Sequence, residues 1–430
     1  ANIGLEEKAF DAEWKAVEGS KYFESPLLYK ENGFKKRETA DQLVDYLREE
    51  EPVMATLAAI ERKQEKKNPP LLYNLAELQN DCSRMLKVSP DETLKIVQEL
   101  YEKKLVTYPR TDARVISTAV SKEIHKNISG LKSLPLVADI ANEILEKGSY
   151  KSIDKTRYCD DKQITDHYAI IPTGQGLGAL NSVSSNGKKV YETIVRRFLS
   201  IFYPAAVYQK VGLTLAIREE KFFANFRVLK EEGYLRIIGN SFDKKADSNN
   251  EEKEDGVRME DLKKLRKGVT LPVNEINIKE GETTPPKRYN SGSIILAMEN
   301  AGQLIEDETL REQIKGSGIG TSATRAEILK KLVNNNYIAL NKKTQILSTT
   351  QIGEMIYDVV NNSITQLLNP ELTASWERGL TYVSEGSITE DEYMQKLNSF
   401  IARRTAAVKG LNNQAQLFRC FNEVAKYYKK

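Results

Sequence analysis

The apolar residues of this 430-residue chain change their spacing along the sequence, and these changes limit the fold. From about residue 205, apolar residues tend to fall at every second position between turn residues, which predicts an antiparallel sheet. The β-rich runs are AAVYQKVGLTLAI, KFFANFRVL, GYLRIIG and VTLPVNEINI. After TTPPKRYNS at 283–291, helical patterns dominate. The sequence therefore predicts a mixed α and β, multidomain protein, because a chain of this length exceeds one compact core.

Two helix starts precede the β-rich region. Asn74 is followed three residues later by Glu77, which is a capping-box pattern. Ser89 has the same relation to Glu92, with Pro90 at the first helical position. Two short helices joined by a tight turn resemble a helix-turn-helix, which also occurs as a pure scaffold.

A second local pattern covers residues 318–350. GIGTSATRAEILKKLV predicts a glycine-rich entry and then a helix with Ala326, Leu329 and Val333 on one face. IALNKKTQILS predicts a hairpin that turns at 341–343. A helix followed by a hairpin is a winged-helix pattern. The polar run DKKADSNNEEKEDG, by contrast, is expected to be a disordered insert.

Cysteine and charge content exclude some kinds of site. Cys82, Cys159 and Cys420 lie far apart without a CxxC pair, which excludes a zinc ribbon and a disulfide framework and favours a reducing cytoplasm.

No apolar run approaches the roughly 18 residues that cross a bilayer, and no leader opens the chain, so we expect no membrane partner. The opening ANIGLEEKAF lacks a Met and suggests a piece of a larger protein. The net charge of +3 neither supports nor excludes a nucleic-acid groove, which needs only a local basic surface.

The segment LVTYPRTDAR surrounds one tyrosine with charged side chains. In an extended segment Tyr108, Arg110 and Asp112 share a face, because successive side chains alternate. A tyrosine nucleophile needs a cation on the attacked group and a polar shell that fixes its geometry. A phosphodiester suits this arrangement, because its non-bridging oxygens match an arginine fork that Asp112 could orient. A surface cluster of salt bridges still fits this stretch alone.

Two further segments are candidates for the same kind of chemistry. ITDHYAIIPT contains His167, one of only two histidines, although a lone histidine is more often structural. GSGIGTSATR is not a P-loop, since no GK[ST] follows its glycines. It is expected to lead into a helix whose first turn carries Thr321, Ser322 and Thr324 and presents N–H and hydroxyl groups to a phosphate. A flexible loop with an ordinary helix cap explains it equally well.

Taken together, these segments resemble the type IA DNA topoisomerases, and most closely their topoisomerase III branch. YPRTD is similar to that family's tyrosine motif, DHYAIIPT to its histidine motif and GIGTSATRAEI to its glycine-led DNA-binding helix. TPPKRY at 284–289 and LTASWERGL at 372–380 also fit, in the right order. Five ordered motifs along nearly the whole chain are specific, whereas PRTD alone is not.

The resemblance implies a role for each matching residue. Tyr108 would attack DNA to form a 5′-phosphotyrosyl link and free a 3′-hydroxyl. Arg110 would bind the scissile phosphate, His167 would assist by a phosphate contact or by positioning, and Asp112 would support that network. The glycine-flanked helix would grip single-stranded DNA just upstream of the break. The DNA-binding residues implied in this way are Gly318, Gly320, Thr321, Ser322, Thr324, Arg325 and Arg288.

The chain departs from the family pattern in three places. An R-G-[FY] turn is replaced by Asn335-Asn336-Tyr337, which puts the family's DNA-backbone contact at Asn335 in question. His167-Tyr168 replaces the double histidine of some relatives. The metal-binding TOPRIM domain, which supplies a glutamate, a lysine and a magnesium site, has no counterpart here. We therefore expect Mg²⁺ only in the full-length enzyme, no metal and no zinc on this chain, and no relaxation of supercoiled DNA by it alone.

The resemblance also implies an architecture, that of a type IA topoisomerase core in the form of a partial toroid. Residues 1–66 and 205–288 would form a β-rich hinge domain. Residues 67–204 would form a tyrosine-bearing winged-helix-like domain, and residues 289–430 a helical domain that binds single-stranded DNA. The implied partners are single-stranded DNA, supercoiled or catenated DNA and the TOPRIM domain, in a bacterial cytoplasm at the nucleoid.

Two other functions fit part of the pattern. A non-catalytic winged-helix DNA-binding protein explains the helix-turn-helix patterns but gives the Tyr-Arg-Asp face no purpose. A tyrosine recombinase needs an Arg-His-Arg set ahead of a near-terminal tyrosine, whereas Tyr108 comes early and precedes His167. Replacement of Tyr108 by phenylalanine separates the first alternative, because only a topoisomerase would lose DNA cleavage.

Overall fold

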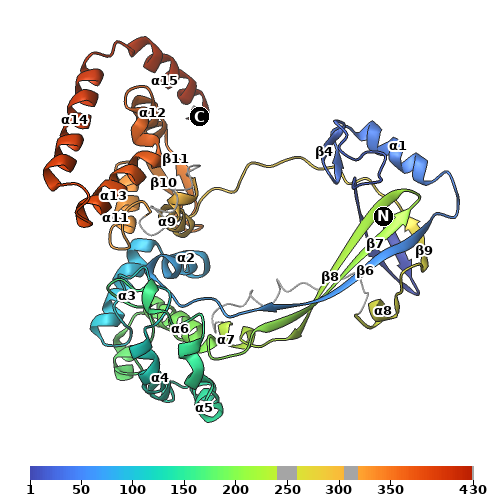
Figure 1. The fold of residues 1–430 in the computed structure, drawn as a ribbon, viewed down its shortest axis with the longest axis horizontal. Coiled ribbons are helices and arrows are strands. Elements are labelled where there is room, and N and C mark those ends of the chain that lie inside the picture. The colour runs from blue at the N-terminus through green and yellow to red at the C-terminus, as the bar shows by residue number, and fades with distance from the viewer. Residues whose placement is uncertain (240–258, 305–317, 429–430) are drawn as a thin grey trace. The chain divides into compact units, whose positions relative to one another are not determined.

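The computed structural model describes residues 1–239, 259–304 and 318–428. Helices and strands both contribute to it, and the helices gather in two stretches of the sequence that flank a strand-rich one (Figure 1). The prediction of a mixed α and β, multidomain protein is confirmed. The polar insert expected at 243–256 lies outside the described residues.

The chain folds into two compact units. The first comprises residues 1–70 and 200–285, and the second comprises residues 71–199 and 286–430. The tyrosine-bearing and C-terminal helical parts thus fall within one unit. The division into three domains and the partial toroid stay predictions.

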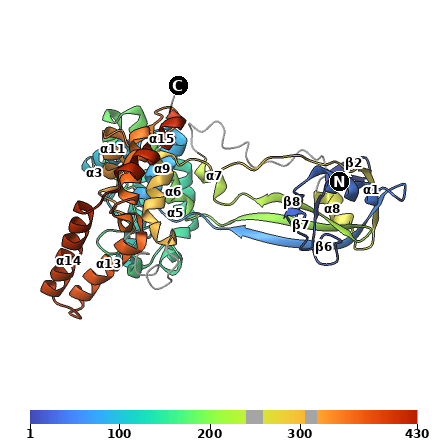
Figure 2. The same cartoon turned by 90° about the horizontal axis from the view of Figure 1, so that it is seen from above.

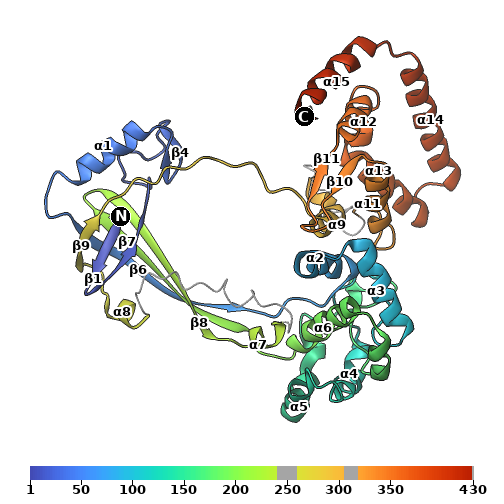
Figure 3. The ribbon, with the colours of Figure 1, turned by 180° about the vertical axis from the view of Figure 1, so that it is seen from behind.

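The first unit is built on a seven-stranded sheet whose neighbouring strands are antiparallel. Its long strands β6 (Met54–Lys67), β7 (Ala206–Ile217) and β8 (Glu220–Glu231) lie side by side (Figures 1 and 3). The short strands are β1 (Asn2–Leu5), β2 (Lys8–Asp11), β3 (Glu13–Lys15) and β9 (Thr270–Glu275). The order across the sheet is β2-β1-β9-β6-β7-β8-β3.

One face of this sheet carries the core of the first unit. In β7 the buried side chains alternate as the period-two pattern predicts, at Val211, Leu213, Leu215 and Ile217. Helix α1 (Arg37–Leu47) contributes apolar side chains to the same core. Helix α8 (Met259–Lys264) and the small hairpin of β4 (Leu28–Lys30) and β5 (Gly33–Phe34) complete the unit.

One predicted strand is a helix instead. GYLRIIG forms the short helix α7 (Leu235–Ile238), which follows a buried Tyr234. Tyr234 and Ile237 are both buried, and their three-residue spacing suits a helical turn. Gly233 has a φ of +52°, and a Cβ there would lie 2.5 Å from the Pro204 carbonyl oxygen. The strand prediction is wrong because this sharp backbone turn breaks the alternation.

The second unit is mainly helical. Residues 71–200 contain α2 (Leu75–Leu86), α3 (Pro90–Glu102), α4 (Thr118–Leu131), α5 (Ala138–Lys147) and α6 (Ser185–Ser200). The C-terminal part contains α9 (Ser291–Glu299), α11 (Arg325–Asn334), α12 (Gln351–Asn361), α13 (Pro370–Ser384), α14 (Glu390–Lys409) and α15 (Gln414–Tyr428). Helices α13 and α14 are neighbours (Figure 2). Trp376 of α13 packs edge-on against Tyr393 of α14.

Both predicted helix starts are confirmed. The Asn74 side chain accepts a hydrogen bond of 2.9 Å from the Glu77 backbone N–H and caps α2. The Ser89 side chain caps α3 through Glu92 N–H. The Glu77 carboxylate does not complete a capping box but accepts a 2.6 Å bond from Arg114.

The predicted wing is confirmed as well. Strands β10 (Ile338–Leu340) and β11 (Leu347–Thr349) form an antiparallel hairpin after α11. The Asn341 side chain accepts from the N–H groups of Lys343 and Thr344 and fixes the turn. Asn336 has a φ of +58°, a conformation that asparagine adopts more readily than most residues. Asparagine can therefore stand where the family pattern has glycine.

Helix α9 packs closely on α2, which joins the two parts of the second unit (Figure 3). A Cβ at Gly292 would lie 2.6 Å from the Asn80 Cα atom, so only glycine allows this approach of the two backbones. The buried hydroxyls of Ser83 and Ser291 are 2.9 Å apart across the contact.

Candidate active site

The tyrosine and histidine motifs pair backbone to backbone. Val106 and Pro172 form an antiparallel bridge, and Thr107 N–H donates a 3.0 Å hydrogen bond to the Ile171 carbonyl. The Thr107 hydroxyl donates to the Ala169 carbonyl at 2.9 Å. This pairing fixes the two motifs in register, although they lie far apart in the sequence.

The pairing brings the Tyr108 and His167 rings together. Their centroids are 4.3 Å apart and the ring planes are tilted by 44°. The Thr111 hydroxyl donates a 2.7 Å hydrogen bond to the His167 carbonyl and anchors the histidine backbone. His167 is exposed and Tyr108 is half-buried, so both rings are accessible. They line one open pocket of about 530 Å³.

Arg110 and Asp112 do not pair with each other in the way the sequence suggested. A guanidinium nitrogen of Arg110 lies 3.5 Å from the Ala323 carbonyl oxygen, at the outer limit of a hydrogen bond. Asp112 accepts a 3.1 Å hydrogen bond from Arg325. The structure thus gives Asp112 a different partner, because the chain between the two motif residues does not follow a straight strand.

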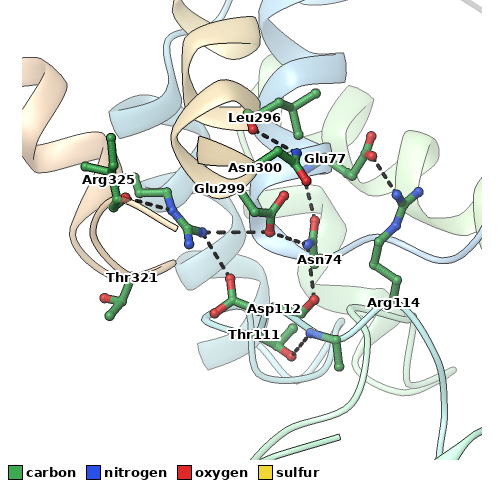
Figure 4. A network of polar contacts seen from close by, with 12 residues as sticks. Asn74, Glu77, Thr111, Asp112, Arg114, Leu296, Glu299, Asn300, Thr321 and Arg325 are labelled. Carbon is green, nitrogen blue, oxygen red and sulfur yellow. Dashed lines mark hydrogen bonds and ion pairs between the residues drawn. The ribbon is translucent and has the colours of Figure 1, made fainter. Parts of the chain in front are cut away.

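Arg325 is the centre of a polar network (Figure 4). Its side chain is only 2% exposed, and its Nη1 lies 3.1 Å from Asp112 and 3.8 Å from Glu299. Its Nε donates to the Ile319 carbonyl at 3.2 Å. A buried guanidinium requires such partners, because an unpaired buried charge is costly. In this conformation Arg325 binds protein groups, although the sequence suggested a DNA contact.

Asn74 extends the network to α2 (Figure 4). Its side-chain amide donates to Glu299 at 2.8 Å and to the Asp112 carbonyl at 3.2 Å. The same side chain caps α2 through its oxygen. One asparagine therefore connects the start of α2, the motif loop and the end of α9.

Burial raises the pKa of the Glu299 carboxyl above its ordinary value of 4.5. The negative charges of Asp112 and Glu77 act in the same direction, while Arg325 and Arg114 oppose them. Desolvation outweighs the attraction of the arginines.

The glycine-led segment differs from its predicted form at its start. Helix α11 begins at Arg325, so Thr321, Ser322 and Thr324 form a turn before the helix and not its first turn. Thr321 N–H donates to the Thr324 hydroxyl at 2.8 Å, and both threonines are exposed.

The two predicted glycines have a backbone role here. Gly318 has a φ of +61°, and a Cβ at this position would lie 2.6 Å from the Glu299 carbonyl oxygen. Gly320 has a φ of +65°. Both conformations favour glycine and let the segment turn against the end of α9. Arg288, the remaining predicted DNA-binding residue, is exposed just before α9.

Sequence reasoning missed three residues of this region: Asn74 as a link, Glu299 and Tyr101. Glu299 did offer a signal, because it ends an otherwise apolar helix, SGSIILAME, where a carboxylate needs a partner. Tyr101 packs edge-on against Tyr108 with centroids 5.4 Å apart. No local pattern in the sequence distinguished it from the other tyrosines.

In the described residues, no group of three or more His, Cys, Asp or Glu side chains lies close enough to hold a metal ion. Nor is any helix within those ranges long and apolar enough to span a membrane. Cys82, Cys159 and Cys420 are free thiols, and burial raises the pKa of Cys82 to about 12.

A family model described as DNA topoisomerase matches residues 6–395. The chain belongs to the DNA topoisomerase family. The resemblance to type IA enzymes of the topoisomerase III branch, predicted from five motifs, is confirmed.

Curated relatives carry the name DNA topoisomerase 3. The Bacillus subtilis protein is 33% identical over 374 residues, which cover 85% of this chain and 48% of the relative. The Bacillus licheniformis protein is 31% identical over 367 residues, with 84% and 48% covered. The chain thus spans about half the length of the curated relatives it matches. The full-length topoisomerase I of Thermotoga maritima has a similar fold, with a TM-score of 0.61 at 20% identity over 94% of this chain and 57% of that one.

Proposed function

We propose that this topoisomerase chain cleaves single-stranded DNA transiently through a 5′-phosphotyrosine link, passes a strand and rejoins the break. The observation that carries the proposal is the shared pocket of Tyr108 and His167, whose rings lie 4.3 Å apart, with Arg110 two residues after Tyr108 in the sequence. A tyrosine in such a pocket is accessible to a phosphodiester, which a surface salt-bridge cluster does not explain.

The chemistry assigns one task to each side chain. The Tyr108 phenol oxygen attacks phosphorus and loses its proton, the bond from phosphorus to the 3′-oxygen breaks, and that oxygen gains a proton. Arg110 would stabilise the charge on the non-bridging oxygens, and His167 would hold the phosphate or the attacking phenol. Asp112 would act through Arg325, which fixes the loop that carries Tyr108 and Arg110. The reverse attack by the 3′-hydroxyl rejoins the strand.

Thr321, Ser322, Thr324 and Arg288 are proposed to contact the DNA strand upstream of the break. Thr321, Thr324 and Arg288 are exposed and Ser322 is half-buried, so their hydroxyls and cation are available to phosphates. Gly318, Gly320 and Arg325 would support this surface by shaping the backbone. We propose supercoiled or catenated DNA as the wider substrate and a bacterial cytoplasm, at the nucleoid, as the location.

Magnesium is proposed to act in the full-length protein, together with a TOPRIM domain. The described residues do not fit a metal ion, since no suitable group of ligands comes together among them. Every step above is therefore assigned to this chain's own residues. We expect the chain alone not to relax supercoiled DNA, and clear relaxation by it in a plasmid assay with magnesium would contradict that expectation.

The test of polarity determines which of the two DNA ends at the break stays covalently attached to the protein. The chain, combined with a TOPRIM domain of the family and magnesium, is incubated with a single-stranded oligonucleotide labelled at its 3′ end or its 5′ end. Because Tyr108 keeps the 5′-phosphate, the 3′ label should migrate with the denatured protein and the 5′ label with a shortened free strand. Tyr108→Phe should abolish the adduct and retain single-strand binding. An adduct that persists in the variant would place the nucleophile elsewhere and overturn the proposal. No adduct from either protein would favour a non-catalytic DNA-binding protein.

A further inference from the structure

The pocket beside Tyr108 extends well beyond the two rings already described. Its volume of about 530 Å³ lies within the range of small-ligand sites, which begins near 300 Å³. In the described part of the chain, the residues that line it belong to two segments, 101–108 and 167–175. They include Tyr101, Lys104 and Tyr168, to which the reaction above gives no task.

The two ends of the tyrosine motif face different surroundings. At one end, Arg110 and Asp112 contact Ala323 and Arg325 of the C-terminal part. At the other end, Tyr108 opens into the pocket, whose walls come from the tyrosine-bearing part alone. A strand that crosses the motif would therefore have its upstream side at the glycine-led segment and its downstream side at the pocket.

We propose that this pocket binds the deoxynucleotide on the 3′ side of the scissile phosphate, with its base stacked on Tyr101. The proposal rests on the proposed function, because cleavage leaves that nucleotide attached to Tyr108 through its 5′-phosphate. Only one phosphate separates its sugar from the phenol ring. The sugar and base can reach only the surface next to Tyr108, and the pocket is that surface.

The side chains fit a nucleotide of any sequence. Tyr101, in the last turn of α3, is 39% exposed, and its ring meets the Tyr108 ring edge-on at 82°. A partly exposed aromatic ring can stack with a base, and such stacking is tolerant of sequence. Lys104 is exposed at the pocket and supplies a cation for the next phosphate.

Tyr168, Thr173 and Gln175 line the pocket as well, together with Val106, Thr107 and the carboxylate Glu102. Tyr168 is half-buried, and burial raises its pKa, so its phenol stays protonated and can donate a hydrogen bond. Thr173 and Gln175 add polar groups on the same side. An apolar wall with a few polar groups is the usual composition of a ligand site.

The test measures binding of a 5′-phosphorylated thymidine trinucleotide to this chain by NMR titration. Its counterpart has an abasic first position. Tyr101→Ala should weaken binding of the base-bearing probe by about 5- to 160-fold, as expected for the loss of one base stack. It should change binding of the abasic probe little. Tyr101→Phe should bind like the wild type, because the ring remains.

Tyr357→Ala is the matched control, because this tyrosine of α12 is 55% exposed and outside the pocket. It should leave both affinities unchanged. The logarithm of the binding constant falls with the logarithm of the salt concentration, and Lys104→Gln should reduce the slope of this line by about one. The far-UV circular dichroism spectrum of each variant shows whether the fold is retained.

Two results would overturn the subsite. One is equal binding of the base-bearing and abasic probes by the wild type, and the other is an equal loss for both probes in Tyr101→Ala. Either result leaves the covalent reaction at Tyr108 untouched. A wild-type chain that forms no adduct in the polarity test would instead overturn the proposed function and the subsite with it.

Discussion

At the scale of single residues, Arg325 contacts protein carboxylates, whereas a contact with DNA was predicted for it. Its sequence context predicted a DNA-binding arginine, yet its guanidinium is buried between Asp112 and Glu299. Asp112 in turn was expected beside Arg110. Both outcomes follow from the approach of α11 to the motif loop, which places one buried cation between two carboxylates.

The Glu299 carboxyl makes a specific prediction about pH. Because its pKa is raised by burial, it binds a proton more tightly in the folded chain than in the unfolded one. The contribution of Glu299 to the unfolding free energy therefore falls as pH rises from the ordinary value of 4.5 through the raised folded value, and is constant above it. The melting temperature of the wild type minus that of Glu299→Gln should thus fall as the pH rises above 4.5 and then level off.

Differential scanning calorimetry at several pH values measures this difference. Glu385→Gln is the control, since this carboxylate is exposed after α13. The melting temperature of the wild type minus that of Glu385→Gln should vary little with pH. If the difference in melting temperature between the wild type and Glu299→Gln stays flat or grows with pH, the assignment of the raised pKa to burial is contradicted.

At the scale of elements, the caps of α2 and α3 differ in how far their contacts reach. Ser89 caps α3 with a single backbone contact from Glu92. Asn74 caps α2 in the same manner but also donates to Glu299 and to the Asp112 carbonyl. The start of α2 is thus tied to α9 and to the motif loop.

Two alanine substitutions separate these roles. Ser89→Ala should lower the unfolding free energy by about 1 kcal/mol, the usual value of a cap. Asn74→Ala should lower it by about 2–4 kcal/mol, because a hydrogen bond to a carboxylate and one to a carbonyl are lost as well. Urea unfolding followed by circular dichroism measures both. Equal losses in the two variants would show that the bonds from Asn74 to Glu299 and Asp112 add nothing to stability.

At the scale of the whole chain, the polypeptide passes between the two units three times, near residues 70, 200 and 285. The last passage follows β9 and precedes α9. Residues 279–289 there are exposed and have no helix or strand. This passage contains Lys279, Lys287 and Arg288, which are sites for trypsin.

Limited trypsin digestion should cut this passage early, because exposed backbone without regular structure is accessible to proteases. The fragments that end and begin near residue 288 should still elute together from a sizing column, since α9 packs on α2. Arg62 is the internal control, because it lies in β6 and its guanidinium donates to two carbonyls. Mass spectrometry identifies the cuts. Separate elution of the fragments, or cleavage at Arg62 first, would contradict the prediction.

The sequence alone determined the features that depend on neighbouring residues. The alternation in β7, the caps at Asn74 and Ser89 and the turn at Asn341 are local, and each was predicted correctly. The family was predicted from the order of five short motifs, which needs no three-dimensional information. The strand predicted at GYLRIIG failed where a backbone turn at Gly233 overrode a local preference.

The tertiary structure decided which distant residues meet. The contact of Tyr108 with His167 depends on backbone pairing of two separate segments, and the partner of Asp112 depends on where α11 begins. The burial of Arg325 and the role of Glu299 depend on α9 lying against α2. A sequence states which side chains are present and their local spacing. Close packing between segments far apart in the chain then sets their partners, their burial and hence their charge.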